Sequence, residues 1–188
     1  MEGTKKYHTM KIAGLNRALE LFQIDENLQI AAFIMFNDTE ITEAAAAELL
    51  KAVPEYDVIM TAECKGIPLV YEMARQAKKP YIVARKKPKL YMKDVISTDA
   101  DSITTAGIQS LCIGSNDVDV IRGKRILIAD DVISTGGSLL AVEALVKAAG
   151  GIIVGKAAVL AEGDAANRKD IIFLEKLPLF DKNGEPIC

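Results

Sequence analysis

The stretch RILIADDVISTGGS, residues 125–138, carries most of the information about the fold. It begins as an apolar run of strand length and continues through two adjacent carboxylates, Asp130 and Asp131. It ends in a loop of glycine and hydroxyl residues, after which residues 137–149 are expected to form a helix closed by Gly150. A buried strand that turns into a helix is the repeating unit of a parallel α/β sheet.

The same alternation of strand and helix runs along the rest of the chain. Hydrophobic periodicity and turn residues predict further strands at 28–36, 57–62, 80–85 and 152–160, and helices at 39–53 and 67–78. Two weak runs, 102–106 and 109–113, are expected to pair as a hairpin, and one more apolar segment covers 171–180. Parallel strands joined by right-handed crossovers form a sheet with helices on both faces. Ligands of such sheets bind at the carboxyl ends of the strands.

Composition narrows the class of protein. The chain has 188 residues and a formal net charge of −3, which disfavours a general nucleic-acid or membrane-surface binder. No apolar run reaches the roughly 18 residues that a membrane span requires, and we expect no secretory signal. Three widely spaced cysteines, Cys64, Cys112 and Cys188, do not form a disulfide framework, which favours a cytoplasmic protein with reduced thiols.

The loop after the acidic pair has the composition of an anion site. Gly136 and Gly137 allow a left-handed backbone and a close approach to a ligand, and the following helix presents free N–H groups. Ser134, Thr135 and Ser138 add hydroxyl donors. A phosphate monoester is the ligand that these groups fit best.

The two carboxylates beside this loop would repel a bare phosphate. Two unit charges ~6 Å apart at an effective dielectric constant of ~20 repel by about 3 kcal/mol. Asp130 and Asp131 therefore indicate a ligand that also carries hydroxyl groups, or a positive charge that develops during reaction. A ribose 5-phosphate that reacts at C1 supplies both.

Residues 125–138 resemble the phosphoribosyl-pyrophosphate motif of type I phosphoribosyltransferases. The resemblance implies an α/β fold, with a mostly parallel twisted sheet, helices on both faces and a small hood built from the chain ends. It implies a single domain over residues 1–188, with a core at about 28–160 and a hood from about 1–27 and 161–188. The expected catalytic residues are Asp130 and Asp131, and the 5-phosphate site comprises Ser134, Thr135, Gly136, Gly137 and Ser138.

Two other segments resemble the purine branch of this family. Residues 61–68, TAECKGIP, are similar to its pyrophosphate loop, and residues 85–90, RKKPKL, are similar to a basic stretch of adenine phosphoribosyltransferases. The resemblance assigns pyrophosphate to Glu63, Lys65, Gly66, Arg85, Lys86 and Lys89. It assigns the base pocket to Val132 and Ile133, while no metal ligand is certain.

Residues 92–110 coincide with the lid that closes over the reacting centre in this family. Adenine members usually carry a glutamate there, where this sequence has Thr104 or Thr105. Thr105 is therefore included among the candidate catalytic residues. The departure leaves the general acid or base unassigned and makes adenine specificity an open question.

The resemblance implies a purine phosphoribosyltransferase of purine salvage. Its expected substrates are phosphoribosyl pyrophosphate and a purine base, with adenine as the first expectation. Mg²⁺ is the expected cofactor, and a homodimer is the expected assembly. A hypoxanthine-, guanine- or xanthine-specific enzyme is one alternative, and a non-catalytic regulator that binds the same ligand is another. A regulator is expected to carry a DNA-binding module, for which the segment before Leu28 is short. The match at residues 85–90 disfavours an enzyme for orotate or uracil.

Overall fold

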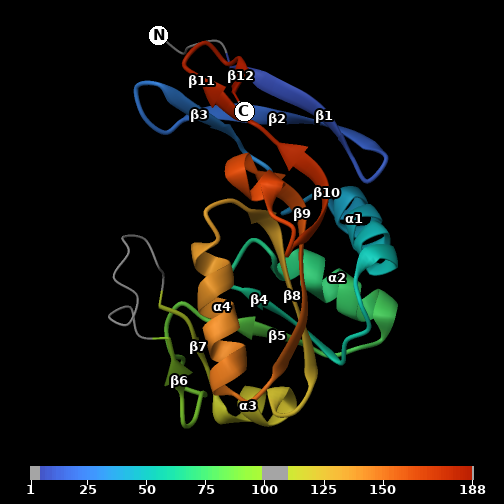
Figure 1. Cartoon of the computed structure of the whole chain (residues 1–188), viewed down its shortest axis with the longest axis vertical. Helices are drawn as coiled ribbons and strands as arrows, with labels where there is room; N and C mark the ends of the chain where they lie inside the picture. Colours follow the sequence, from blue (N-terminus) through green and yellow to red (C-terminus); the bar gives the residue numbers. More distant parts are fainter. Residues whose placement is uncertain (1–4, 99–109, 188) are drawn as a thin grey trace.

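The computed structural model describes residues 5–98 and 110–187, and its centre is a parallel sheet of five strands (Figure 1). The strand order is β10-β9-β8-β4-β5, and every neighbouring pair is parallel. The strands are β4 (Val58–Ala62), β5 (Tyr81–Ala84), β8 (Arg125–Ile133), β9 (Ile152–Glu162) and β10 (Ile172–Leu177). Because β8 is the central strand, its carboxyl end lies in the middle of the edge where the segments after β4 and β9 also emerge.

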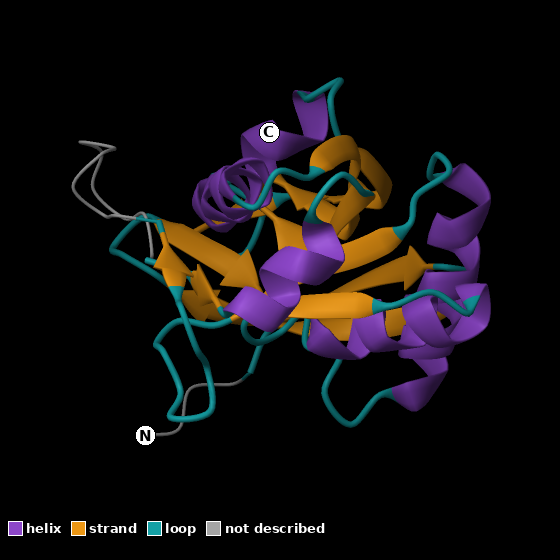
Figure 2. Cartoon of the chain, turned by 90° about the horizontal axis from the view of Figure 1, so that it is seen from below, coloured by secondary structure: helices purple, strands orange, loops and turns teal. Residues whose placement is uncertain are grey.

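Helices cover both faces of this sheet, as Figure 2 shows. The helices α1 (Thr39–Ala52) and α2 (Ile67–Ala77) share one core cluster with Leu127 and Ala129 of β8. The helices α3 (Ser115–Ile121) and α4 (Gly137–Ala148) share the second cluster with Ile126 and Ile128. Successive residues of β8 thus point to opposite faces, which is why its first half, residues 126–129, is apolar without interruption. The predicted fold class is confirmed.

A second sheet is antiparallel and takes its strands from both ends of the chain (Figure 1). Its order is β1-β2-β3-β11-β12, with β1 (Tyr7–Ile12), β2 (Leu15–Gln23), β3 (Leu28–Ala31), β11 (Leu179–Asp181) and β12 (Pro186–Ile187). Only Pro178 separates β10 in the parallel sheet from β11 in this one. In addition, Arg17 on β2 binds Asp38, with 2.7 Å between Nε and Oδ2, and Asp38 caps α1.

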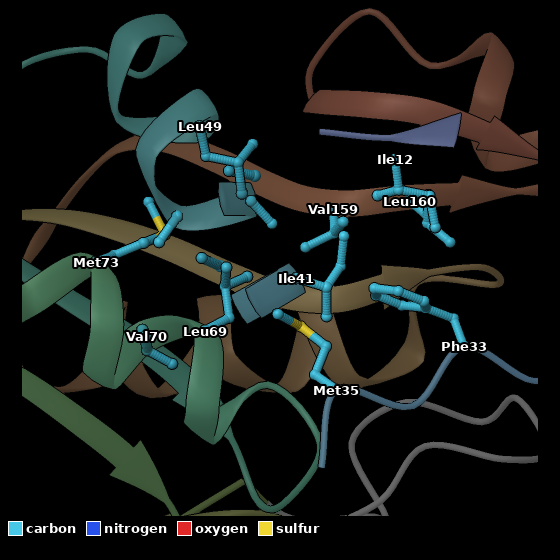
Figure 3. Close-up of a cluster of buried hydrophobic side chains, with 14 of the residues drawn as sticks. Ile12, Phe33, Met35, Ile41, Leu49, Leu69, Val70, Met73, Val159 and Leu160 are labelled. Carbon is cyan, nitrogen blue, oxygen red and sulfur yellow. The ribbon is translucent and has the colours of Figure 1, made fainter. Parts of the chain in front are cut away.

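The two sheets share a hydrophobic core. Figure 3 shows Ile12 of the antiparallel sheet in the same cluster as Ile41 of α1 and Leu160 of β9. These three side chains are 0% exposed. Complete burial of one such side chain stabilises a fold by about 1.5–3 kcal/mol, so this shared cluster joins the sheets firmly. No helix in the described part of the chain is long and apolar enough to cross a membrane.

Several local predictions need correction. The strand expected at 28–36 ends at Ala31, although Phe33 and Met35 beyond it are buried. The short strand β7 (Cys112–Ile113) pairs with β6 (Ile96–Ser97), so the partner predicted for 109–113 was wrong, and 102–106 lies outside the described residues. The apolar segment 171–180 is divided between the two sheets as β10 and β11. Hydrophobic patterning marks buried segments, but it does not say where a strand bends or which neighbour it joins.

Candidate functional site

The loops after β4 and β8 meet around a cleft of about 250 Å³ at the carboxyl edge of the parallel sheet. This cleft contains the acidic pair, Asp130 and Asp131, and the start of the predicted phosphate loop, residues 134–138. It also contains part of the predicted pyrophosphate site. Its lining is Ala62, Glu63, Cys64, Lys65, Lys86, Asp130, Asp131, Val132, Ser134 and Ser138. Because these residues come from segments far apart in the sequence, the fold has assembled most of the predicted site.

The acidic pair lies within β8, which continues to Ile133. Asp131 is 2% exposed, and its Oδ2 accepts no hydrogen bond from the described residues, although Lys65 Nζ lies 3.2 Å away. The backbone N–H of Asp131 donates to Asp130 Oδ1 at 3.0 Å. Burial, reinforced by the neighbouring Asp131 carboxylate, raises the pKa of Asp130 well above its usual value. The free protein therefore disfavours two charged carboxylates side by side, and among the described residues Lys65 is the cation that lies close to Asp131.

The phosphate loop contains a glycine with a left-handed backbone, directly before α4. Gly136 has φ +83°, which a residue with a Cβ rarely adopts, and α4 begins at the next residue. No side chain of the described residues caps α4, so within them the N–H groups of its first turn remain available to a ligand. They face a small hollow of about 60 Å³ lined by Asp130 and residues 132–139. Free N–H groups at a helix start are a typical anion site, and the hollow is of a size for one phosphate group.

Gly66, in the loop after β4, is packed directly against the acidic pair. A Cβ at this position would collide with Thr61 Oγ1 and lie 2.5 Å from Asp130 Oδ1. Its φ is −72°, so the position requires glycine for space and not for conformation. This close approach brings Lys65 within reach of Asp131.

Glu63 connects this loop to the basic segment 85–89. Its carboxylate accepts a hydrogen bond from the backbone N–H of Lys86 at 3.1 Å and lies 3.6 Å from Arg85 Nη1. The Lys86 side chain lines the cleft. Lys89 is exposed and does not line it. Three of the six predicted pyrophosphate residues, Glu63, Lys65 and Lys86, therefore line the cleft. Gly66 packs against Asp130 and Arg85 lies beside Glu63, whereas Lys89 is exposed and is not part of the lining.

The remaining predicted residues differ in their placement. Val132 lines the cleft, whereas Ile133 is 3% exposed and packs in the core against α4, where it offers little surface to a base. Thr105, the candidate from the lid, lies outside the described residues.

Comparison with known proteins agrees with this geometry. The family model "Phosphoribosyl transferase domain" matches residues 35–184. The chain belongs to this family. The matched range contains both loops of the cleft, the basic segment and the whole parallel sheet.

Curated relatives in the family carry two kinds of name. A hypoxanthine/guanine phosphoribosyltransferase of Methanococcus voltae is 29% identical over 134 residues, which are 71% of this chain and 68% of the relative. An adenine phosphoribosyltransferase of Malacoplasma penetrans is 33% identical over 103 residues, 55% of this chain and 57% of that protein. The matched stretch thus spans about three fifths to two thirds of these relatives.

Solved structures of family members share the fold. The adenine phosphoribosyltransferase of Thermoanaerobacter pseudethanolicus superposes with a TM-score of 0.63 at 25% identity, covering 76% of this chain and 84% of the other. That of Leishmania tarentolae gives a TM-score of 0.64 at 20% identity, covering 92% and 84%. The type I phosphoribosyltransferase architecture is therefore established for this chain.

Two charged residues near the site were missed by the sequence analysis. Glu162, the last residue of β9, lies two residues after Leu160, which pairs with Val132 of the cleft. Burial raises the pKa of Glu162, an effect that the charge of Lys65 partly offsets. Arg168 lies against Gly136 of the phosphate loop. The predicted strand 152–160 ended two residues before Glu162. A strand extended to residue 162 would have placed this glutamate at the same sheet edge as the acidic pair, and that was the signal available in the sequence. No sequence pattern indicated Arg168.

The donor set fits a magnesium ion that is shared with a ligand. The described residues contain no group of three or more His, Cys, Asp or Glu side chains able to hold a metal alone. Asp130 and Asp131 nevertheless offer carboxylate oxygens, one of them a buried atom without a hydrogen-bond donor. Mg²⁺ is commonly held by one or two carboxylates together with water and substrate phosphate oxygens.

Proposed function

We propose that this protein is a purine phosphoribosyltransferase. It transfers the 5-phosphoribosyl group of phosphoribosyl pyrophosphate to a purine base, adenine first, giving a nucleoside monophosphate and pyrophosphate in purine salvage. One observation carries the proposal: within one strand and its loop, an acidic pair, of which Asp131 is buried, precedes a helix start that no described side chain caps, and Lys65 lies 3.2 Å from Asp131. Sugar hydroxyls, a 5-phosphate and a pyrophosphate would each find complementary groups in this arrangement.

The 5-phosphate is bound by the loop Ser134–Ser138 through backbone N–H groups and hydroxyls. Asp130 and Asp131 accept hydrogen bonds from the ribose hydroxyls, and Lys65, Arg85 and Lys86 supply positive charge for pyrophosphate. Anchoring the phosphate fixes C1 relative to the base, which lowers the entropic part of the barrier.

The chemistry is a substitution at C1. The bond from C1 to the pyrophosphate oxygen breaks, its electron pair leaves with pyrophosphate, and a ring nitrogen of the base forms the new bond and loses its proton. Positive charge grows on the sugar in between, and the acidic pair stabilises it electrostatically. Asp130 and Asp131 would hold Mg²⁺ together with oxygens of the ligand, and the ion would supply charge neutralisation for the leaving group. The group that takes the base proton is unassigned, with Thr105 as the candidate from the lid.

Adenine is proposed as the base because residues 85–90 resemble the basic stretch of adenine enzymes and an adenine-named relative is 33% identical. The name of the Methanococcus voltae relative keeps hypoxanthine and guanine as the second candidates. We propose that the antiparallel sheet from the chain ends forms the hood over the base, beside Val132.

The family resemblance also leads us to propose a cytoplasmic homodimer. The free thiols of Cys64 and Cys112 agree with a reducing compartment. Exposed aromatic side chains, among them Phe36 and Tyr71, line a hollow of about 420 Å³ between the start of α1 and α2, a surface suited to a second copy. Light scattering after size-exclusion chromatography measures the mass in solution, and a monomer at micromolar concentration contradicts the dimer.

The decisive experiment incubates the protein with Mg²⁺, phosphoribosyl pyrophosphate and one base at a time, and measures pyrophosphate release. We expect release with adenine, at least tenfold faster than with hypoxanthine, guanine or xanthine. The reverse order contradicts adenine specificity and supports the second candidate. No release with any base, combined with calorimetric binding of phosphoribosyl pyrophosphate, supports the regulator. Absence of both activity and binding rejects the proposal.

A further inference from the structure

Arg168 covers the left-handed glycine of the phosphate loop. It follows the short helix η2 (Gly163–Asn167), and its Nη1 lies 2.9 Å from the position that a Cβ on Gly136 would occupy. Gly136 is buried. Arg168 does not line the 60 Å³ hollow, so the guanidinium lies against the loop from outside that hollow.

An ion-pair network fixes the orientation of this guanidinium. Its Nε donates to Asp170 Oδ1 at 2.9 Å, and its Nη2 donates to Asp170 Oδ2 at 2.7 Å, a planar two-bond geometry that leaves Nη1 directed at Gly136. Asp170 also binds Lys156 Nζ at 2.6 Å, and Lys156 lies 3.1 Å from Glu143 of α4. The arginine is therefore tied to the helix whose first turn forms the anion site.

The phosphate loop itself has no positive side chain, so the charge of the Arg168 network matters for a bound phosphate. Residues 132–139 contain no basic residue, and two carboxylates precede them, so a bound phosphate adds negative charge to a negative region. Arg168 and Lys156 share two carboxylates, Asp170 and Glu143. Lys147 Nζ also lies 4.0 Å from Glu143, so three cations face two carboxylates and the network carries one excess positive charge. The pKa of Asp170 is held well below its usual range by Arg168 and then by Lys156, so the network stays ionised at neutral pH.

We propose that Arg168, locked by Asp170, is a positioning residue for the 5-phosphate of the substrate. It holds Gly136 in the conformation that opens the N–H groups of α4, and it adds positive potential behind the bound phosphate. This inference rests on the proposed function, because it takes residues 134–138 as the 5-phosphate site.

The test compares Arg168→Gln and Arg168→Lys with the wild type. Arg125→Gln is the matched control. It removes an arginine whose side chain donates a similar pair of hydrogen bonds to an aspartate, Asp57, at the opposite end of β8. Calorimetry with Mg²⁺ measures the Kd of phosphoribosyl pyrophosphate, and steady-state assays measure KM and kcat. We expect Arg168→Gln to raise Kd and KM about tenfold with kcat within twofold, since a charge at ~6 Å is removed. We expect Arg168→Lys to recover most of the loss and Arg125→Gln to resemble the wild type.

The outcomes separate the inference from the function on which it rests. Unchanged Kd in Arg168→Gln, with binding intact in the wild type, overturns the inference alone. Equal losses in the Gln and Lys variants overturn the role of charge, and an equal loss in the Arg125 control overturns the specific role of Arg168. A wild type that does not bind the substrate overturns the proposed function and the inference together. Should Arg168→Gln fail to fold by circular dichroism, Arg168→Met makes the same measurement with the aliphatic packing retained.

Discussion

The two ends of β8 carry charge in opposite ways. At its start, Arg125 and Asp57 are opposite charges joined by several hydrogen bonds, including 2.9 Å between Nη2 and Oδ1, and both are well exposed to solvent. At its end, the neighbouring carboxyl groups of Asp130 and Asp131 disfavour each other's charged form, and among the described residues Lys65 is the cation close to Asp131. The first arrangement lowers the free energy of the protein alone. The second raises it until a ligand supplies hydroxyls and cations.

The pKa values show the same contrast. Hydrogen bonds from Arg125 lower the pKa of Asp57 to about 2, whereas burial raises the pKa of Asp130. Folding therefore favours the charged form of the first carboxyl and the neutral form of the second. Ionic interactions that stabilise the fold and ionic groups that serve a reaction can thus be separated along a single strand.

The sharpest test of this contrast is Asp130→Asn. We expect the rate of pyrophosphate release to fall by more than tenfold, to about one hundredth, because the charge on the sugar loses its stabilising carboxylate. We also expect the free energy of unfolding at pH 7 to rise. A carboxyl with a raised pKa in the folded state stabilises it fully below its unfolded pKa, near 3.8, and loses that contribution as pH rises through the folded value.

Because asparagine resembles the protonated carboxyl at every pH, the stability difference between variant and wild type should be largest at neutral pH and small near pH 4. Urea unfolding at both pH values measures it. Turnover near that of the wild type would show that Asp130 has no role in the mechanism. A variant less stable than the wild type at pH 7 would contradict the conclusion that the charge of Asp130 destabilises the fold.

Gly66→Ala tests whether the acidic end depends on close packing. The new methyl group would lie 2.5 Å from Asp130 Oδ1, so the loop or the carboxylate must shift, and we expect kcat/KM to fall about tenfold. Gly114→Ala is the control, because its nearest neighbouring atoms lie 3.5 Å away and its φ is −91°. Equal activity in the two variants would show that the contact at Gly66 has no functional consequence.

Lys65→Gln removes the cation nearest to the acidic pair. Since Lys65 is about half exposed and its interaction is screened, we expect a moderate effect, with KM for phosphoribosyl pyrophosphate rising about fivefold. Lys51→Gln is the control, because it breaks an exposed pair with Glu48 on the surface of α1, and it should leave KM unchanged. A rise in KM with both variants would indicate a general charge effect and not one specific to the site.

The smallest effect is expected at the opposite end, with Asp57→Asn. Activity should stay within twofold of the wild type, while the urea midpoint at pH 7 falls slightly. The sign follows from the lowered pKa: the stabilising contribution is present above the unfolded value of 3.8 and is lost as pH falls towards about 2. Urea midpoints of both proteins between pH 7 and pH 2.5 check this, and a difference that grows as pH falls contradicts the assignment.

Much of the parallel layer could be predicted from sequence. Residues 126–129 are apolar on both faces, and the turn at Gly136 needs a left-handed backbone, so strand, loop and helix leave local signals. The same holds for α1, where Asp38 caps the helix by accepting from the N–H of Ile41. The acidic pair and the phosphate loop could be proposed from sequence for the same reason: their residues are contiguous in the chain.

The antiparallel layer and the outer parts of the site left weaker signals. In β1, buried and exposed residues alternate without a matching apolar pattern, as in YHTMKI, and the pairing of β3 with β11 joins the two ends of the chain. Arg168 reaches Gly136 only through the tertiary fold, so no spacing in the sequence reports it. Ile133 shows the converse error, because an apolar residue next to a ligand loop can equally belong to the core.

The pairing of β3 with β11 also has a consequence for the order of folding during synthesis. Gln29 is made 151 residues before its partner Phe180. The strands β4, β8 and β9 can pair before that point, whereas the antiparallel sheet must wait until β11 has been made. A nascent chain would thus complete its phosphate loop well before the layer proposed to cover the base, and for that interval its substrate site would stand open.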